Sequence, residues 1–131
     1  MFDLDKIKAV QARSVAENWP YHYLFNSLKA LGIERYEVNV LTHETKYVGE
    51  GASLLAPVPE GFKTLMVAET YDEDALKKAL LRVQARETDY ARFLAEIAAA
   101  GVSFYRVDMR PRTVTYHGVG GKKLVEKVPE S

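Results

Sequence analysis

The chain has 131 residues, 47% of them hydrophobic, and its 18 basic residues balance its 18 acidic ones. This length suits one domain with its own core, and the cancelled charge excludes a strong field that would attract nucleic acid or an anionic membrane. With no cysteine, disulfides and thiolate chemistry are excluded as well. The start lacks a signal-peptide pattern, and no apolar run reaches the ~18 residues of a membrane span. We expect one cytoplasmic domain over 1–131 that binds neither nucleic acid nor membrane.

Two helices are predicted at the start of the chain. Asp3 can cap a first helix, whose apolar residues recur at helical spacing until it fades near Glu17. Pro20 separates it from the next helix, because the residue before a proline leaves the helical region while proline itself suits a first helical turn. An apolar stripe over 20–31 predicts the second helix, and Gly32 ends it.

Alternation of apolar and polar residues predicts an antiparallel meander after these helices. The segments 33–41 and 45–49 are the first two strands. A loop at 41–42 would set Tyr36 opposite Tyr47, with the tyrosines and valines on one face.

The second half of the chain repeats the first. Placing Gly32 on Gly101 gives a shift in numbering of 101 − 32 = 69, which also aligns Tyr36 with Tyr105 and Tyr47 with Tyr116. We call this shift the repeat offset. For the first helix of each half, Val10–Arg13 matches Val83–Arg86 at a larger offset of 83 − 10 = 73, which predicts extra residues near Asn18-Trp19 in the first half.

We therefore predict tandem repeats over about 3–59 and 70–129, joined by a linker over 60–69 in which Lys63–Glu69 forms an edge strand. The predicted fold is α+β: one domain of two pseudo-symmetric repeats, each with two helices and an antiparallel meander. A turn at Arg110-Pro111 pairs Tyr105 with Tyr116. The tyrosine and valine face is the expected core, with the helix stripes through Tyr21 and Tyr90 packed on it.

The opposite sheet face is the first candidate binding surface. It carries an aromatic ring among polar and charged groups, a composition typical of contact patches. Its candidate residues are Phe104, Arg106, Asp108, Thr115 and His117. Trp19 and Tyr23, which lack aromatic counterparts in the second half, are further candidates. The alternative interpretation is an ordinary solvated face.

No motif in the sequence carries catalytic or metal chemistry. Its three histidines, His22, His43 and His117, have no second metal ligand at a recognised spacing. The glycine clusters lie between predicted strands, which makes them turn residues and not a phosphate loop. We predict no metal and no cofactor, and we leave the catalytic residues unknown and the question of catalysis open.

The second half also resembles a known family. The stretch GVSFYRVDMRPRTVTYHG, with the preceding VQARETDYARFLAEIAAAG and the closing KLVEKVP, resembles an uncharacterised bacterial and prophage family of the YbcV type, whose members are loosely labelled phage envelope proteins. The matching positions are Gln84, Asp89-Tyr90, Phe93, Ala100-Gly101-Val102, Asp108, Tyr116, Glu126 and Pro129. The resemblance implies a shared fold and brings no activity and no catalytic residues.

These observations favour a non-enzymatic module that binds a protein or a small ligand. The alternative is a small-molecule enzyme or ligand sensor with a cleft between the repeats, in which His117, Asp108 and Arg106 serve as acid, base and anion holder. We also predict a homodimer, because the segment Lys122–Val128 can leave an unpaired strand edge.

Overall fold

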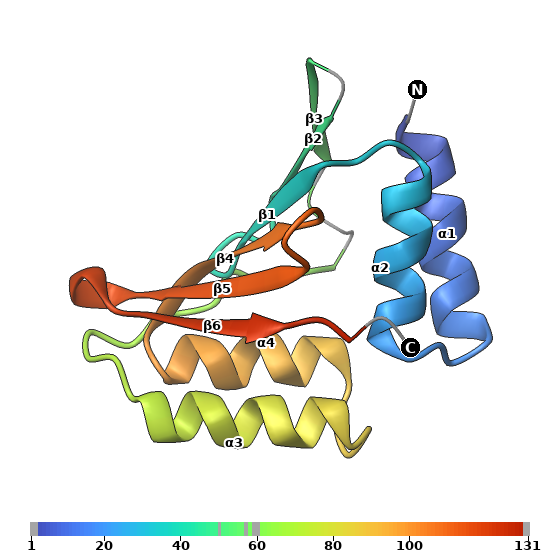
Figure 1. Ribbon diagram of the computed structural model, residues 1–131. Helices are drawn as coiled ribbons and strands as arrows, with labels where there is room; N and C mark the ends of the chain where they lie inside the picture. The colour runs from blue at the N-terminus through green and yellow to red at the C-terminus, as the bar shows by residue number, and fades with distance from the viewer. Residues whose placement is uncertain (1–2, 50, 57, 59–60, 130–131) are drawn as a thin grey trace.

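The computed structural model describes residues 3–49, 51–56, 58 and 61–129, and it has the predicted α+β order of elements. The boundary predicted at 59–60 lies outside the described residues. In chain order, the elements of Figure 1 are α1 (Leu4–Ala16), α2 (Tyr21–Ala30), β1 (Arg35–Asn39), β2 (Thr45–Gly49), β3 (Ala52–Ala56), α3 (Glu73–Gln84), α4 (Tyr90–Ala99), β4 (Val102–Asp108), β5 (Thr113–Gly118), the 3-10 turn η1 (Val119–Gly121) and β6 (Lys123–Lys127).

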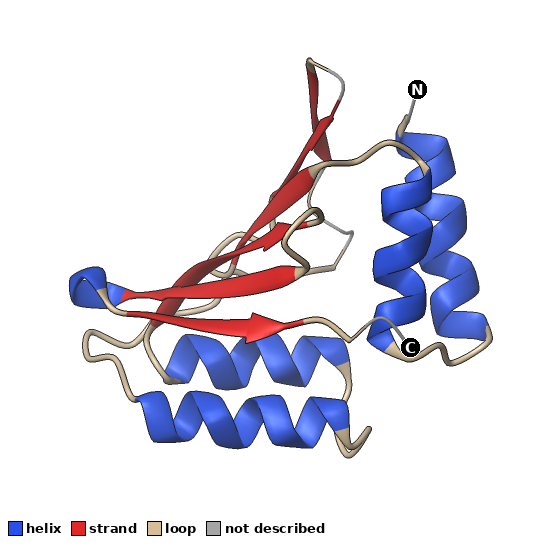
Figure 2. Ribbon diagram, in the orientation of Figure 1, coloured by secondary structure: helices blue, strands red, loops and turns tan. Residues whose placement is uncertain are grey.

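The strands form one antiparallel sheet in the order β3-β2-β1-β4-β5-β6 (Figure 2). Each half contributes a three-stranded meander, and the halves meet where β1 pairs with β4. Buried side chains of α1, α2, α3 and α4 join one core with the tyrosines and valines of the sheet. Both helix pairs therefore cover the same face, and the other face is left open.

The register within each half agrees with the sequence pattern. Tyr36 pairs with Tyr47, and Tyr105 pairs with Tyr116. All four tyrosines are buried, as predicted. Alternating side chains leave a strand on opposite faces, so the period of the pattern was enough to identify the buried face.

The pairing of β1 with β4 is symmetric under the repeat offset. Tyr36 lies opposite Val107, and Val38 lies opposite Tyr105. These two pairs are equivalent, because the repeat offset aligns Tyr36 with Tyr105 and Val38 with Val107. The pair that maps onto itself is Glu37 with Arg106. The β1–β4 strand pair thus has an approximate local two-fold axis at this pair of residues.

The starts of α1 and α3 correct one prediction. Asp3 caps α1 and Asp72 caps α3, each accepting a hydrogen bond from the backbone N–H three residues later. These caps are related by the repeat offset (72 − 3 = 69), so the predicted offset of 73 is wrong for the helix starts. The connection after α1 is also the shorter one, spanning 17–20 against 85–89. The position of the capping side chain determines where a helix begins, whereas the match at an offset of 73 rested on a short run of similar residues.

The predicted edge strand at Lys63–Glu69 is also wrong. This segment is extended but lies in no strand. Leu65 N–H donates to the Leu41 carbonyl (3.0 Å) and Ala68 N–H donates to the Ala98 carbonyl (2.9 Å), so its bonds go to a turn and a helix end. Leu65 and Val67 pack against the core, while Met66 between them is 90% exposed. The alternation that suggested a strand reflects the packing of a linker across the core.

Two tyrosines predicted on core stripes lie at the margin of the core. Tyr21 is 41% exposed and Tyr90 is 43% exposed. Their hydroxyls nevertheless reach inward, where Tyr21 hydrogen-bonds the Tyr36 hydroxyl (2.6 Å) and Tyr90 hydrogen-bonds that of Tyr105. Each half therefore has the same hydrogen bond from a helix start to the sheet.

Substitution of Gly101 should separate close packing from backbone strain. Gly101 has φ +87°, and an added Cβ would lie 2.5 Å from the Thr70 carbonyl oxygen. Gly120 has φ +72° with nothing within 4 Å of an added Cβ. We expect Gly101→Ala to lower the free energy of unfolding by about 3 kcal/mol and Gly120→Ala by about 1 kcal/mol, measured by urea denaturation. Equal losses would contradict the close approach of the Thr70 backbone to Gly101.

Candidate functional site

The open sheet face brings together the five predicted residues of β4 and β5. Phe104, Arg106, Asp108, Thr115 and His117 all point away from the helices, because they alternate with buried residues along their strands. We call these five residues the outer-face patch. Each is partly exposed, so the patch is available to a partner.

Phe104 and His117 form a stacked aromatic pair in this patch, which we call the aromatic platform. They are opposite each other across β4 and β5, with ring centroids 4.3 Å apart and an interplanar angle of 8°. The register shifts between Val102 and Phe104, and Ser103 there donates its hydroxyl to the His117 carbonyl (3.2 Å). Irregularities of this kind re-aim side chains, which here places the two rings face to face.

Arg106 lies near the centre of the sheet between two carboxylates. Its Nε donates to Asp108 Oδ1 (3.1 Å), and its Nη1 is 4.0 Å from Glu37 Oε1. All three side chains are partly exposed, so each pair contributes no more than about 1 kcal/mol. The guanidinium is thereby oriented, and much of its charge is already balanced within the protein.

The structure does not bring the proposed acid and base together. His117 pairs with Phe104, which is four residues before Asp108 on β4. At the usual rise of a strand, this separation is about 13 Å. Direct proton exchange between His117 and Asp108 through one substrate atom is therefore not supported by the geometry.

A shallow hollow of about 340 Å³ adjoins the platform on the same face. It is lined by Glu37, Asn39, Glu44, Lys46, Leu55 and Phe104. Of the predicted residues, only Phe104 contributes to it. The others come from the first half and its β1–β2 turn, and the sequence analysis missed them because they depend on which strands of the two halves are adjacent. The outward alternation of β1, β2 and β3 was the available signal, and Leu55 is 60% exposed.

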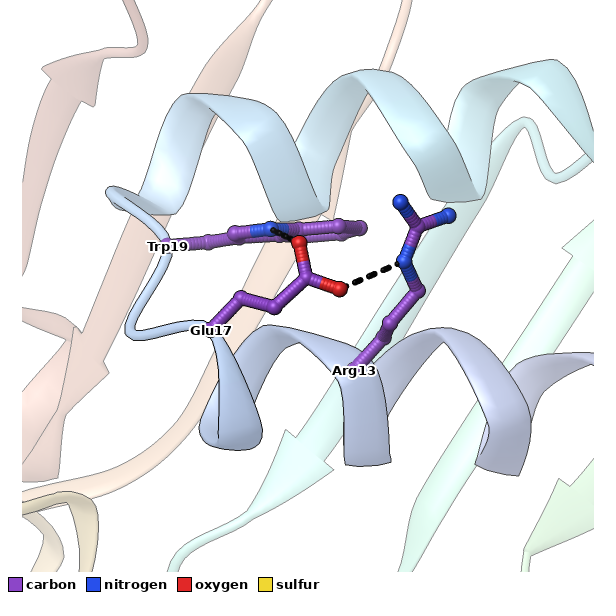
Figure 3. Close-up of polar contacts among 3 residues, drawn as sticks. All are labelled: Arg13, Glu17 and Trp19. Carbon is purple, nitrogen blue, oxygen red and sulfur yellow. Dashed lines mark hydrogen bonds and ion pairs between the residues drawn. The ribbon is translucent and has the colours of Figure 1, made fainter.

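Trp19 and Tyr23 lie apart from this patch, at the α1–α2 connection. Trp19 Nε1 donates to Glu17 Oε1 (3.1 Å), while Arg13 Nε donates to Glu17 Oε2 (2.8 Å) (Figure 3). The Arg13 guanidinium lies 5.3 Å from the Trp19 ring centroid, and Trp19 meets Tyr23 edge-on at 6.3 Å. The hydrogen bond from Arg13, followed by that from Trp19, lowers the pKa of Glu17. These contacts give Trp19 a structural role in fixing the connection.

His43 is a chemically distinct residue that sequence analysis did not select. It lies in the turn after β1 at φ 65°, and its ring is 4.7 Å from Phe62 and 5.5 Å from Tyr90. Its Nδ1 is buried and makes no hydrogen bond within the described part of the chain. The repeat offset places Arg112 at the equivalent turn position, with φ 55° and its guanidinium 4.5 Å from the Phe25 ring.

Neither a metal cluster nor a membrane span was found where the chain is described. Among those residues, no three histidine, aspartate or glutamate side chains are grouped to hold a metal ion. Within the same ranges, no helix combines the length and the apolar character needed to cross a membrane.

His43 should make stability depend on pH. Burial lowers its pKa below the ordinary 6.5, so the folded state holds the neutral ring where the unfolded chain takes up a proton. This contribution is complete above about pH 6.5 and is lost as the pH falls through the lowered pKa. We expect His43→Asn, which tolerates the left-handed turn, to be less stable at pH 7.5 but to lose less stability than the unsubstituted chain on going to pH 5.5. Equal losses in urea denaturation would contradict this assignment.

Comparison with known proteins gives a family and no activity. A comparison with curated proteins produced no match. A family model described as "Protein of unknown function (DUF1398)" matches residues 8–127, which includes all six strands, three whole helices and most of α1. The chain therefore belongs to the DUF1398 family of proteins of unknown function.

Proposed function

We propose that this protein is a non-enzymatic binding module that contacts its partner through the outer-face patch. The observation that carries the proposal is the Phe104–His117 stack beside the hollow on the uncovered sheet face. A partly exposed aromatic pair surrounded by hydrogen-bonding side chains is the usual composition of a protein contact surface. The hollow is shallow and open to solvent, which suits a protein partner better than an enclosed small molecule.

The alternative of a small-molecule enzyme or sensor has weaker support. Its acid and base candidates, His117 and Asp108, lie at opposite ends of the β4–β5 pair. Arg106, its candidate anion holder, is engaged by Asp108 and Glu37. Native mass spectrometry of the purified chain separates the two proposals, because a retained small ligand would favour the sensor.

We also propose that the protein is related to the YbcV-type proteins. Two of the motif positions that suggested it have clear structural roles. Asp89 caps α4 by accepting the Arg92 N–H, and Gly101 adopts φ +87° directly after that helix. The motif thus supports a common fold, and we draw no virion role from it.

A photo-cross-linker tests the binding face. Thr115 lies beside the platform, so a benzoylphenylalanine there should yield a discrete cross-linked partner in cells that express the protein. The same group at Lys78, exposed on α3, is the matched control and should not yield that product. Phe104→Ala should reduce the yield from position 115 at least ~10-fold with little change in stability, since a central aromatic often contributes about 2 kcal/mol or more to binding. Equal cross-linking from positions 115 and 78 would refute the proposal.

Self-association through β6 is a second part of the proposal. β6 is at one border of the sheet, with Lys123, Val125 and Lys127 exposed along it. A monomer would result if the linker at Lys63–Glu69 covered this edge, but that linker makes its backbone bonds to Leu41 and Ala98. An uncovered strand edge is a template for pairing, and its lysines favour a specific two-fold contact over open polymers.

Sedimentation at micromolar concentration tests this dimer. We expect a species of twice the 14.8 kDa chain mass, whose population rises with concentration. Val125→Lys should shift it toward the monomer by adding like charge between Lys123 and Lys127 of the edge. A single 14.8 kDa species at every concentration would retire the dimer.

A further inference from the structure

A groove at one end of the sheet is separate from the outer-face patch. It has a volume of about 620 Å³ and lies between the end of α2, the start of β1 and the end of β4. Its lining residues are Lys29, Gly32, Ile33, Glu34, Met109 and Arg110. We call it the empty groove.

The other half of the molecule has the equivalent groove on the same backbone frame. The repeat offset relates the two sets of lining residues, and the equivalents are Ala98, Gly101, Val102, Ser103, Val40 and Leu41. Met109 N–H donates to the Glu34 carbonyl across the empty groove (3.0 Å), and Val40 N–H donates to the Ser103 carbonyl across its equivalent (3.0 Å). The two grooves therefore have matching walls.

The equivalent groove is occupied by the protein's own linker. Leu65 N–H donates to the Leu41 carbonyl and Ala68 N–H donates to the Ala98 carbonyl, while Leu65 and Val67 pack on the core. Figure 1 shows this linker in yellow-green, leading from the sheet to the start of α3. An extended segment with two main-chain hydrogen bonds and alternate apolar side chains thus fits this shape of groove.

The empty groove offers the same acceptors without that segment. The equivalents of the Leu41 and Ala98 carbonyls are those of Arg110 and Lys29. In the described part of the chain, no backbone N–H donates to the Arg110 carbonyl. Within that same part, the Lys29 carbonyl accepts only from Leu31 and Gly32 at its own helix end, as the Ala98 carbonyl accepts from Ala100 and Gly101. Among the described residues, none makes the bonds to these two carbonyls that Leu65 and Ala68 make in the equivalent groove.

The charges of the rim indicate which segment would bind there. Lys29, Arg110 and Glu34 stand where the occupied groove has Ala98, Leu41 and Ser103. Two cations and one carboxylate give the rim a net positive charge, and both cations are exposed. This charge favours a segment with carboxylates on either side of its apolar residues.

We propose that the empty groove binds an extended acidic segment of a partner polypeptide. Its main-chain N–H groups donate to the Arg110 and Lys29 carbonyls, and its apolar side chains take the places that Leu65 and Val67 take in the equivalent groove. Its carboxylates face the Lys29 ammonium and the Arg110 guanidinium. In this binding mode, main-chain hydrogen bonds hold the peptide and side-chain contacts select its sequence. The empty groove would be a second binding site, separate from the outer-face patch.

Peptides based on the protein's own linker provide the probe. The acidic peptide is GFEELMVAET, the sequence of 61–70 with glutamate in place of Lys63 and Thr64, and the basic peptide is GFKKLMVAKT, with lysine in place of Thr64 and Glu69. Fluorescence anisotropy of each labelled peptide is measured against the full chain. We expect the acidic peptide to bind at least ~10-fold more tightly than the basic one, and a scrambled acidic peptide to bind at least ~10-fold more weakly.

A charge reversal locates the site. The double variant Lys29→Glu with Arg110→Glu should bind the basic peptide better than the acidic one. The matched control, Lys78→Glu with Arg92→Glu, makes the same change in net charge at exposed positions of α3 and α4 and should keep the original preference. If circular dichroism shows the reversed variant unfolded, Lys29→Gln with Arg110→Gln replaces it and should abolish the preference.

Three results would overturn the proposal. One is the absence of peptide binding, and another is equal binding of the acidic peptide and its scrambled form, which would reduce the effect to net charge. The third is an acidic preference that survives in the folded reversed variant. Concentration-dependent dimerisation that disappears in the reversed variant, without peptide binding, would instead assign the empty groove to a second copy of the chain.

Discussion

The pairing of β1 with β4 is the constraint on which the rest of the structure depends. It joins two three-stranded meanders into one sheet, so that four helices share one core instead of covering two small ones. Its register places Tyr36 opposite Val107 and Val38 opposite Tyr105, all on the covered face. A slip by one residue would turn these side chains to the open face and bring the charged ones inside. The Glu37–Arg106 pair at its centre belongs to the open face, where it orients the arginine at little energetic cost.

The tyrosines make this shared core partly polar. Burial, with the neighbouring tyrosines next, raises the pKa of Tyr36 and Tyr105 well above its ordinary range. Burial also raises the pKa of Tyr21 and Tyr90, although their rings reach the surface, because their hydroxyls lie inside against those of Tyr36 and Tyr105. A hydroxyl inside a protein must find a partner, and here helix and sheet tyrosines supply one another. The stability that the folded protein gains by keeping these tyrosines neutral is fully present below about pH 10. It is lost as the pH rises through the raised pKa values.

Local patterns predicted the strands and the tyrosine pairs, because a period of two and a short turn fix both faces and register at once. The outer-face patch followed from the same alternation. The offset of 73 was wrong because the capping aspartates determine where α1 and α3 begin, and a short run of similar residues does not. The edge strand at 63–69 was wrong because an extended segment can pack on the core without pairing with a neighbouring strand. The sequence could not predict the hollow beside Leu55, the environment of His43 or the empty groove. Each of them depends on how the two halves of the chain pack against one another. No local signal encodes the β1–β4 contact.

That contact is also the most demanding for an unfolded chain to form. Glu37 pairs with Lys46 inside its own meander but with Arg106 across the join, a full repeat offset further along the chain. Loop closure costs about 2 kcal/mol for the first pairing and about 4 kcal/mol for the second. Each meander can therefore form early at a small entropic cost. Pairing the two halves closes a much longer loop, and only burial of the shared core offsets that larger cost. We therefore expect the β1–β4 contact, which makes the molecule one body, to be the last part of it to assemble.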